Sequence, residues 1–305
     1  MLRYVIRRLL WSALGLFIVA FITFSLMHLV PGGPWDRQKA LDPQVIENLN
    51  KKYGLDRPFI VQFGSYIWNT LHGDLGVSYQ YQDRGVTQIL AQGIPITATL
   101  GISAFLLALL VGLPLGMAAA LKQNSPVDYI SVVFATIFAS VPGFVLGIFL
   151  IIIFAVKLHW VPTGGWGSTR QLILPAISLA ALPAAYIARI SRASVLDVIR
   201  QDYVRTARAK GLGERRVIFR HAFRNALLPI ITNGALEMAF LFSGAIVTET
   251  IFSLQGMGYL FYQGLLAHDY FLLMGIVLIG SILVVFFNLV ADVLYAVADP
   301  RIRYD

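Results

Sequence analysis

The sequence predicts an all-α integral membrane protein with six transmembrane helices. Of its 305 residues, 57% are hydrophobic and only 13% are charged, and the mean hydropathy is +0.72. A soluble domain is about 45–50% apolar and about 25% charged, so this chain has too few polar side chains to cover a surface facing water. Stretches of ~18 apolar residues indicate bilayer-spanning helices. The six candidate spans are 9–30, 97–121, 130–156, 172–188, 227–251 and 271–297.

The first apolar run, 9–30, follows three arginines, a pattern that a secretory signal also has. The run is longer than a signal-peptide core of about 7–15 residues, and a Pro-Gly-Gly-Pro sequence at 31–34 stands where a small-x-small cleavage site would be. We therefore expect an uncleaved first span rather than a signal.

The segment 31–96 after this span carries six basic and six acidic residues. Phe59, Ile60, Phe63 and Ile67 recur within it at helical spacing, which predicts a short amphipathic helix lying on the outer surface. Two interpretations stay open: a cap that shields the outer mouth of a pathway, and a docking surface for a soluble partner.

Prolines interrupt the second, third and fourth spans at Pro114, Pro142, Pro175 and Pro183. A membrane helix tolerates proline where neighbours or cavity water satisfy the freed carbonyl. These kinks are compatible with helices that rock to open alternately to each side, and also with a passive bundle.

Three acidic residues fall inside the spans: Glu237 near a middle, and Glu249 and Asp292 toward span ends. An ionised group at a span centre costs about 2.5–3.5 kcal/mol, so it usually faces a cavity or a partner. Glu237 is interpreted either as a contact for substrate or pore water or as a structural hydrogen-bonding group. Glu249 and Asp292 are expected to make pairing interactions near the interfaces.

Basic residues predict the orientation. With the N-terminus inside, 16 of the 24 Lys and Arg residues lie on the inner side, and the short outer connections hold 2. The rest lie in 31–96, which exceeds the length of about 60 residues for which the positive-inside rule holds. Both termini are therefore expected in the cytoplasm.

The cytoplasmic loop 189–226 is the most informative stretch. A helix is expected from about Ser194 through Lys210, because the glycines at 211 and 213 supply a stop. Val204, Ala207 and Gly211 form a narrow face of small side chains, and Arg205, Arg208 and Lys210 flank it. Such a face favours a protein partner, although a loop helix packed on its own bundle has the same pattern.

A second helix is expected in the same loop, with an apolar stripe of Phe219, Ala222, Phe223 and Ala226. Arg216, Arg220 and Arg224 line another face, and Glu214 is the one acid nearby. An unpaired basic face beside a bilayer attracts anionic headgroups. In a membrane protein the placement of the net charge of +8 matters more than its size, and we expect membrane lipid, and not nucleic acid, as a partner.

Signatures of catalysis are missing from the sequence. It has no GxxxxGK[ST] phosphate loop and no GxSxG element, its five histidines show no metal-binding spacing, and it has no cysteine. We expect no catalytic residue, no metal site and no bound cofactor, so energy for any transport must come from another subunit.

Several stretches resemble the binding-protein-dependent permeases of the type I ABC importer class, foremost RTARAKGL at 205–212 and RNALLP at 224–229. The resemblance covers nearly the whole chain and is closest to the oligopeptide-permease B-type subunits of the peptide, dipeptide and nickel branch. The supporting stretches are KYGLDRP at 52–58, HGDLGVSY at 72–79, AALKQN at 119–124, HWVPTGGW at 159–166, VTETIF at 247–252 and VLYAVADPRIRY at 293–304.

The resemblance implies the type I permease fold with three parts: 1–93 as first helix and extracytoplasmic segment, 94–293 as permease domain, and 294–305 as cytoplasmic tail. It also implies that the helix before Gly211 is the coupling helix, which sits on an ATPase. Its residues are Tyr203, Val204, Arg205, Thr206, Ala207, Arg208, Lys210 and Gly211. Thr206, Ala207 and Gly211 match the family signature, whereas Arg205 stands where the general signature has glutamate.

The implied partners are a second similar permease, two cytoplasmic ABC ATPases that hold ATP and Mg, and an extracytoplasmic substrate-binding protein. The implied function is translocation of oligopeptides across the bacterial inner membrane by alternating access. Alternatives are a permease for dipeptides, nickel or glutathione, or a self-powered secondary transporter. An intramembrane enzyme is disfavoured, because no catalytic set is recognisable.

Overall fold

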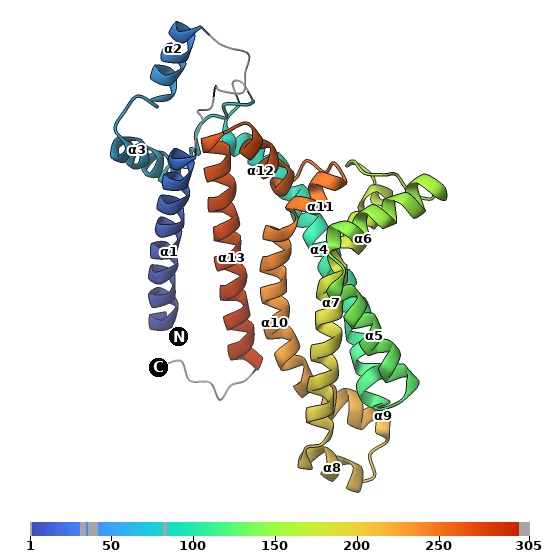
Figure 1. Ribbon diagram of the computed structural model, residues 1–305. Coiled ribbons are helices and arrows are strands. Elements are labelled where there is room, and N and C mark those ends of the chain that lie inside the picture. The colour runs from blue at the N-terminus through green and yellow to red at the C-terminus, as the bar shows by residue number, and fades with distance from the viewer. Residues whose placement is uncertain (1, 31–34, 36–41, 82–83, 299–305) are drawn as a thin grey trace. The chain divides into compact units, whose positions relative to one another are not determined.

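The computed structural model describes residues 2–30, 35, 42–81 and 84–298, in which the regular elements are helices apart from one isolated bridge between Val77 and Gly85 (Figure 1). The Pro-Gly sequence at 31–34 lies outside these residues, and the expected tail 294–305 is described only through Ala298, which ends a helix.

The chain forms two compact units that are each discontinuous in sequence. Of the described residues, unit 1 contains those up to Thr97 together with Gln255–Val285, and unit 2 contains Ala98–Leu254 and residues 286–298. Two long helices, α4 (Val86–Leu121) and α13 (Tyr270–Ala298), contribute to both units. The expected division at residue 93 stays a prediction.

Unit 1 is built around the first helix and the segment that follows it. Besides parts of α4 and α13, it contains α1 (Leu2–Leu29), α2 (Pro43–Tyr53), α3 (Phe59–Leu71) and α12 (Met257–Leu266). The helix expected around Phe59–Ile67 is confirmed as α3, whose Phe63 and Tyr66 pack with Phe24 of α1 and Met274 of α13 in one buried cluster.

A buried carboxylate fixes the start of α13. Asp269 accepts hydrogen bonds from the Ser78 hydroxyl and from the backbone N–H groups of Tyr79, Gln80 and Leu272, the last three at 3.0, 3.2 and 3.2 Å. Burial raises the pKa of Asp269, and these four hydrogen bonds act in the opposite direction. One side chain thus caps the helix and ties the 78–80 loop to it.

Unit 2 holds the remaining helices, which pack closely through small residues. Gly112 of α4 lies against Ala184, so that a Cβ at Gly112 would be 2.7 Å from the Ala184 carbonyl oxygen. Small residues permit such close approach of membrane helices. The helices are α5 (Pro126–Ser140), α6 (Gly143–Leu150), the π-helix η1 (Ile151–Lys157), α7 (Thr169–Ile199), α8 (Asp202–Ala209), α9 (Glu214–Arg216), the π-helix η2 (Val217–Ala222), α10 (Phe223–Gly244) and α11 (Ile246–Ile251).

Two of the expected spans fall on candidate membrane helices but differ from the prediction in shape or length. The third span, 130–156, is not straight: α5 and the helix from Gly143 to Lys157 meet at 98° across Val141 and Pro142, where the backbone is extended. The fourth span, 172–188, lies within α7, which is itself a candidate membrane span and continues through Pro175 and Pro183 to Ile199.

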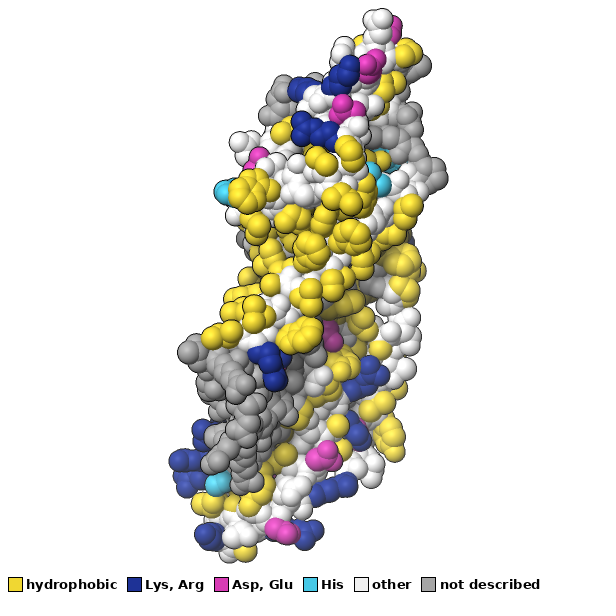
Figure 2. Space-filling model, turned by 90° about the vertical axis from the view of Figure 1, so that its left-hand side faces the viewer, with side chains coloured by type: hydrophobic (Ala, Val, Ile, Leu, Met, Phe, Trp, Pro, Cys, Tyr) yellow, Lys and Arg dark blue, Asp and Glu magenta, His cyan; other side chains and the backbone are white. Residues whose placement is uncertain are grey.

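Among the described residues, four helices are long and apolar enough to cross a membrane, or five with the bent pair counted as one span. The expected fifth span, 227–251, falls on α10 and α11. The all-helical class is confirmed, whereas the number of six crossings and the cytoplasmic location of the termini stay predictions. On the face shown in Figure 2, hydrophobic side chains form a broad band and the charged side chains lie mostly outside it, as a lipid-facing surface requires.

Candidate coupling segment

The chain between α7 and α10, residues 200–222, is the candidate site and is called the 200–222 segment below. It contains α8, α9 and η2 and lies at the lower end of unit 2 in Figure 1. The helix expected from Ser194 through Lys210 is in fact two helices. The backbone is extended at Gln201 (φ −71°, ψ 149°), so α7 ends at Ile199 and α8 begins at Asp202.

A glycine ends α8, as expected. Gly211 adopts φ +78°, a left-handed conformation that side chains disfavour. The Gly211 N–H donates to the Arg208 carbonyl at 2.9 Å and the Leu212 N–H to the Ala207 carbonyl at 3.4 Å. These two bonds form a Schellman motif, which satisfies carbonyls that the helix end would leave unpaired.

Two members of the small-residue face of α8 point into the protein. Val204 is 0% exposed and Ala207 is 6% exposed, and both pack against Val217 of η2 with Val198 and Leu212 around them. These two residues are thus packed as in the alternative interpretation, a loop helix on its own unit, and the coupling role expected for the residues of α8 stays a prediction. Gly211 is the member of the face that remains exposed.

The opposite face of α8 is polar and open. Tyr203, Arg205, Thr206, Arg208 and Lys210 are all exposed. We call these five residues the outer face of α8.

Two of the outer-face arginines have acidic neighbours. Arg208 donates to both carboxylate oxygens of Glu214, at 2.7 and 3.1 Å. This pairing raises the pKa of Arg208 and lowers that of Glu214. Arg205 lies 3.7 Å from Asp202, a long contact between two exposed side chains, so its charge remains available to a partner.

An ion pair with a buried carboxylate joins α7, the helix that precedes the 200–222 segment, to α5. Arg192 of α7 donates to both oxygens of Asp128 at 2.6 and 2.8 Å, and the Asn124 N–H donates to Asp128 at 3.0 Å. The pair joins the first turn of α5 to α7 seven residues before α7 ends. The sequence alone did not reveal this pair, although the Ser-Pro-x-Asp pattern at 125–128 is a helix start that could have drawn attention to Asp128.

The second expected loop helix is continuous with α10 through α9 and η2. The apolar stripe expected on this helix is only partly buried: Ala222 and Ala226 are buried, whereas Phe219 is exposed. Arg216, Arg220 and Arg224 are exposed. Anchoring of these arginines to lipid stays a prediction.

The three acids expected inside the spans lie on three different helices. Glu237 on α10 and Asp292 on α13 are partly buried, and Glu249 on α11 is 0% exposed. In the part of the chain that the structure describes, no group of three or more His, Asp or Glu residues could hold a metal ion. A pathway role for these acids stays a prediction.

The chain matches two family models along its length. The family described as the binding-protein-dependent transport system inner membrane component matches residues 112–304, and the N-terminal family of the same transport systems matches residues 1–101. The chain belongs to this family. The expected resemblance is thereby confirmed, and the protein is a permease of the inner membrane.

Relatives match the permease over its whole length or nearly so. The oligopeptide transport system permease proteins OppB of Salmonella typhimurium (strain LT2) and of Escherichia coli (strain K12) are each 42% identical over 306 residues and cover 100% of both chains. A putative peptide transport system permease protein of Brucella abortus (strain 2308) is 39% identical and covers 99% of both chains. These relatives are permeases, so the expectation that the chain is not itself an enzyme is confirmed.

Solved structures agree with the permease in fold. Inward-facing conformations of the MetNI methionine ABC transporter match with a TM-score of 0.61 at 18% identity, over 70% of this chain and 97% of that chain. An amino acid ABC transporter crystallised with histidines matches with a TM-score of 0.52 at 16% identity, over 71% and 95%. The ABC importer permease fold is thus shown, and membership implies that the permease works with an ATPase and a substrate-binding protein.

Proposed function

We propose that the permease translocates oligopeptides and that it pairs with a second similar permease, two ATPases and an extracytoplasmic binding protein. The observation that carries this proposal is the 42% identity, without truncation on either side, to permease proteins of oligopeptide transport systems. The expected alternatives within the class are dipeptides, nickel and glutathione.

We further propose that α8 is the element through which ATP binding and hydrolysis act on the spans. Its outer face is polar and exposed, and its inner face packs on η2, which continues into α10. A push on α8 would therefore be transmitted to α10 through Val204, Ala207 and Val217. The Arg192–Asp128 pair would transmit the same push from α7 to α5.

The test is uptake by the complete importer in proteoliposomes with enclosed ATP. Arg205→Glu reverses a charge that extends from the outer face of α8 and makes only a long contact within the chain. We expect this variant to lose most peptide uptake and to recover less ATPase subunit in a pull-down. Arg170→Glu makes the same change on an exposed residue at the start of α7 and is expected to leave both measurements unchanged.

Substitution of Ala207 by a bulky residue would be a poor test of docking. Ala207 is buried against Val217, so Ala207→Trp would damage the segment whether or not a partner binds there. Normal uptake and pull-down by Arg205→Glu would contradict the docking proposal.

The substrate and the energy source need separate measurements. Labelled oligopeptide uptake should be blocked by excess unlabelled oligopeptide, whereas blocking by dipeptide, glutathione or Ni²⁺ would point to those substrates. Uptake driven by an ion gradient in vesicles that hold this chain without ATPases would contradict the importer mechanism and favour a secondary transporter.

A further inference from the structure

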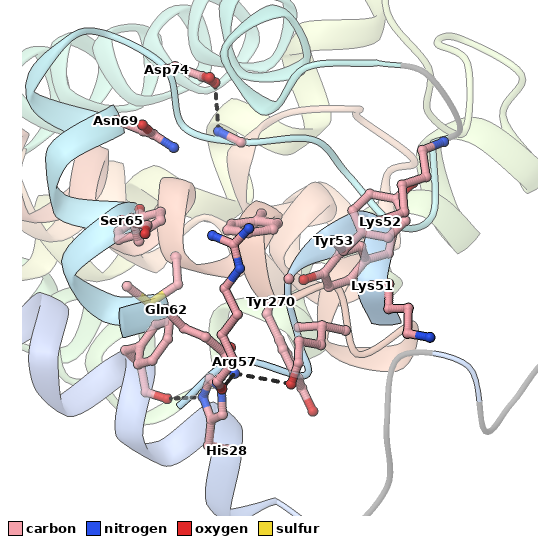
Figure 3. Close-up of a pocket in the computed structure, with 18 residues that line it drawn as sticks. His28, Lys51, Lys52, Tyr53, Arg57, Gln62, Ser65, Asn69, Asp74 and Tyr270 are labelled. Carbon is pink, nitrogen blue, oxygen red and sulfur yellow. Dashed lines mark hydrogen bonds between the residues drawn. The ribbon is translucent and has the colours of Figure 1, made fainter. Parts of the chain in front are cut away.

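Unit 1 contains a cavity of about 220 Å³ that the proposed transport function does not use. It is lined by the outer end of α1, the end of α2, one side of α3 and the first residues of α13 (Figure 3). Its floor is aromatic and apolar, and its polar groups are mostly hydrogen-bond donors and cations, so its chemistry points to an anionic ligand.

Arg57 is the central cation. Figure 3 shows its side chain extending into the cavity, between α3 on one side and Tyr53 on the other. Gly54, with φ +68°, turns the chain after α2, and a Cβ at Gly54 would lie 3.6 Å from Arg57 Cδ and Nε. The Arg57 side chain therefore lies over the turn at Gly54, where any other residue would place a Cβ against it. Among the described residues, its guanidinium has neither a hydrogen bond nor an ion pair.

One acidic residue lines the cavity, and Glu47 and Asp56 lie just outside the lining. Asp74 is the one acidic residue in its lining, and it accepts a hydrogen bond from the Gly76 N–H at 2.9 Å. Glu47, outside the lining, pairs with Lys51 at 2.6 Å. The lining holds three basic residues, Lys51, Lys52 and Arg57, and one acidic residue, Asp74, so that basic side chains outnumber acidic ones around the cavity.

His28 also lines the cavity. The Gln62 amide nitrogen donates to the carbonyls of Leu55 and Arg57 at 3.1 and 2.7 Å, which fixes the Gln62 oxygen toward His28 Nε2 at 3.2 Å. His28 Nδ1 faces the Phe24 carbonyl at 2.9 Å. Both ring nitrogens thus lie within hydrogen-bonding distance of an oxygen, which holds the imidazole ring at the edge of the cavity.

A buried hydroxyl group completes the lining. Tyr79 is 4% exposed, and its hydroxyl has no hydrogen-bond partner among the described residues. Burial raises the pKa of Tyr79 far above its ordinary value, so the phenol keeps its proton and can donate. An unpaired buried hydroxyl is costly, and a ligand oxygen in the cavity would remove that cost.

The position of the cavity identifies the source of the anion. His28 lies in the last turn of the apolar span Ile6–Leu29, at the depth where lipid headgroups begin. Beside it, α3 exposes Ile60, Trp68 and Leu71 at 80, 66 and 76%, a surface typical of helices that lie in the membrane interface. We propose that this cavity binds the phosphate of a membrane phospholipid headgroup, with Arg57 as its bidentate donor.

The test is lipid binding to the full-length permease in complex with its partner subunits. The complex is purified in detergent, stripped of lipid and titrated with phosphatidylglycerol, and lipid adducts are counted by native mass spectrometry. We expect Arg57→Gln to weaken binding of one lipid about tenfold or more, because it removes a charge-assisted bidentate contact. Tyr79→Phe, which removes only the hydroxyl, should weaken the same adduct by a smaller factor.

Control measurements distinguish a lipid site from a general effect of charge and from a site for a soluble anion. Arg170→Gln removes an exposed arginine of unit 2 and should leave the adduct unchanged. Equal lipid adducts in wild type and Arg57→Gln would overturn the proposal. Inorganic phosphate or glycerol 3-phosphate binding as tightly as the lipid would also overturn it, since the site would then serve a soluble anion. So would a loss of binding-protein affinity in Arg57→Gln with unchanged lipid adducts.

Discussion

Helices α3 and α8 are both short amphipathic helices outside the candidate spans, yet they expose opposite kinds of side chain. α3 buries Phe63 and Tyr66 and exposes large apolar residues, whereas α8 buries Val204 and Ala207 and exposes charged ones. The difference indicates their surroundings: α3 suits the bilayer interface, and α8 suits an aqueous protein surface. It also predicts that truncating a buried side chain destabilises α3 more than α8, because the side chains that α3 buries are far larger than those that α8 buries.

The largest effect is expected from Phe63→Ala on α3. The Phe63 ring packs edge-on against Phe17 and Phe21 of α1, with centroids 5.7 and 5.3 Å away. Truncating a buried phenylalanine costs about 3–5 kcal/mol, so the unfolding free energy of the purified chain in detergent should fall by roughly that amount. Trp68→Ala, on the exposed side of the same helix, should change it by less than about 0.5 kcal/mol. Equal losses in the two variants would contradict the assignment of the two faces.

On α8 the corresponding change, Val204→Ala, should have a smaller effect. It removes two buried carbon atoms from a cluster of only a few side chains, which costs roughly 1.5 kcal/mol at about 0.8 kcal/mol for each. Hydrogen exchange should report it as about tenfold faster exchange of α8 amides, with unit 1 unaffected. The matched control is Arg205→Ala on the outer face, which should leave the exchange rates unchanged.

The sequence predicted α3 as an amphipathic helix. For α8 it predicted a helix but not which surface covers its small side chains, and the difference has a physical reason. The aromatic spacing around Phe59–Ile67 has one favourable solution, burial of the large rings, so the helix could be predicted. Small residues such as Val204 and Ala207 fit equally well against a partner or against the chain itself. Their spacing therefore located the helix without determining which surface covers its small-residue face.

The features that the sequence did not predict depend on residues far apart in the chain. Asp269 binds the 78–80 loop about 190 residues away, and Asp128 binds Arg192, 64 residues away. No local pattern identifies either partner. The 98° bend at Pro142 has a local signal, since proline disfavours the helical conformation in the residue before it, but many membrane helices continue through proline, as α7 does at Pro175 and Pro183.

The two glycines that follow α8, Gly211 and Gly213, differ in the backbone angle φ and so provide a further comparison. Gly211 has φ +78° and Gly213 has φ −58°, and a Cβ at either would meet no atom within 4 Å. Gly211→Ala should therefore lose about 1–2 kcal/mol of local stability through backbone strain alone. Gly213→Ala should be neutral or slightly stabilising, because alanine restricts the unfolded chain. Similar exchange rates for α8 amides in both variants would show that a side chain at position 211 does not strain the backbone.

The smallest effect should come from pH, through the Arg208–Glu214 pair that links α8 to α9. Because Arg208 lowers the pKa of Glu214 in the folded protein, the pair stabilises the segment above the unfolded pKa of the carboxyl. That stabilisation is lost as the pH falls through the lower folded value. Both side chains are more than a third exposed, so the loss should stay below about 1 kcal/mol. Exchange of α8 amides, corrected for intrinsic rates, should rise modestly in acid and not in Glu214→Gln. A rise of the same size in that variant would assign the pH dependence to another group and leave the pair without measurable effect on α8.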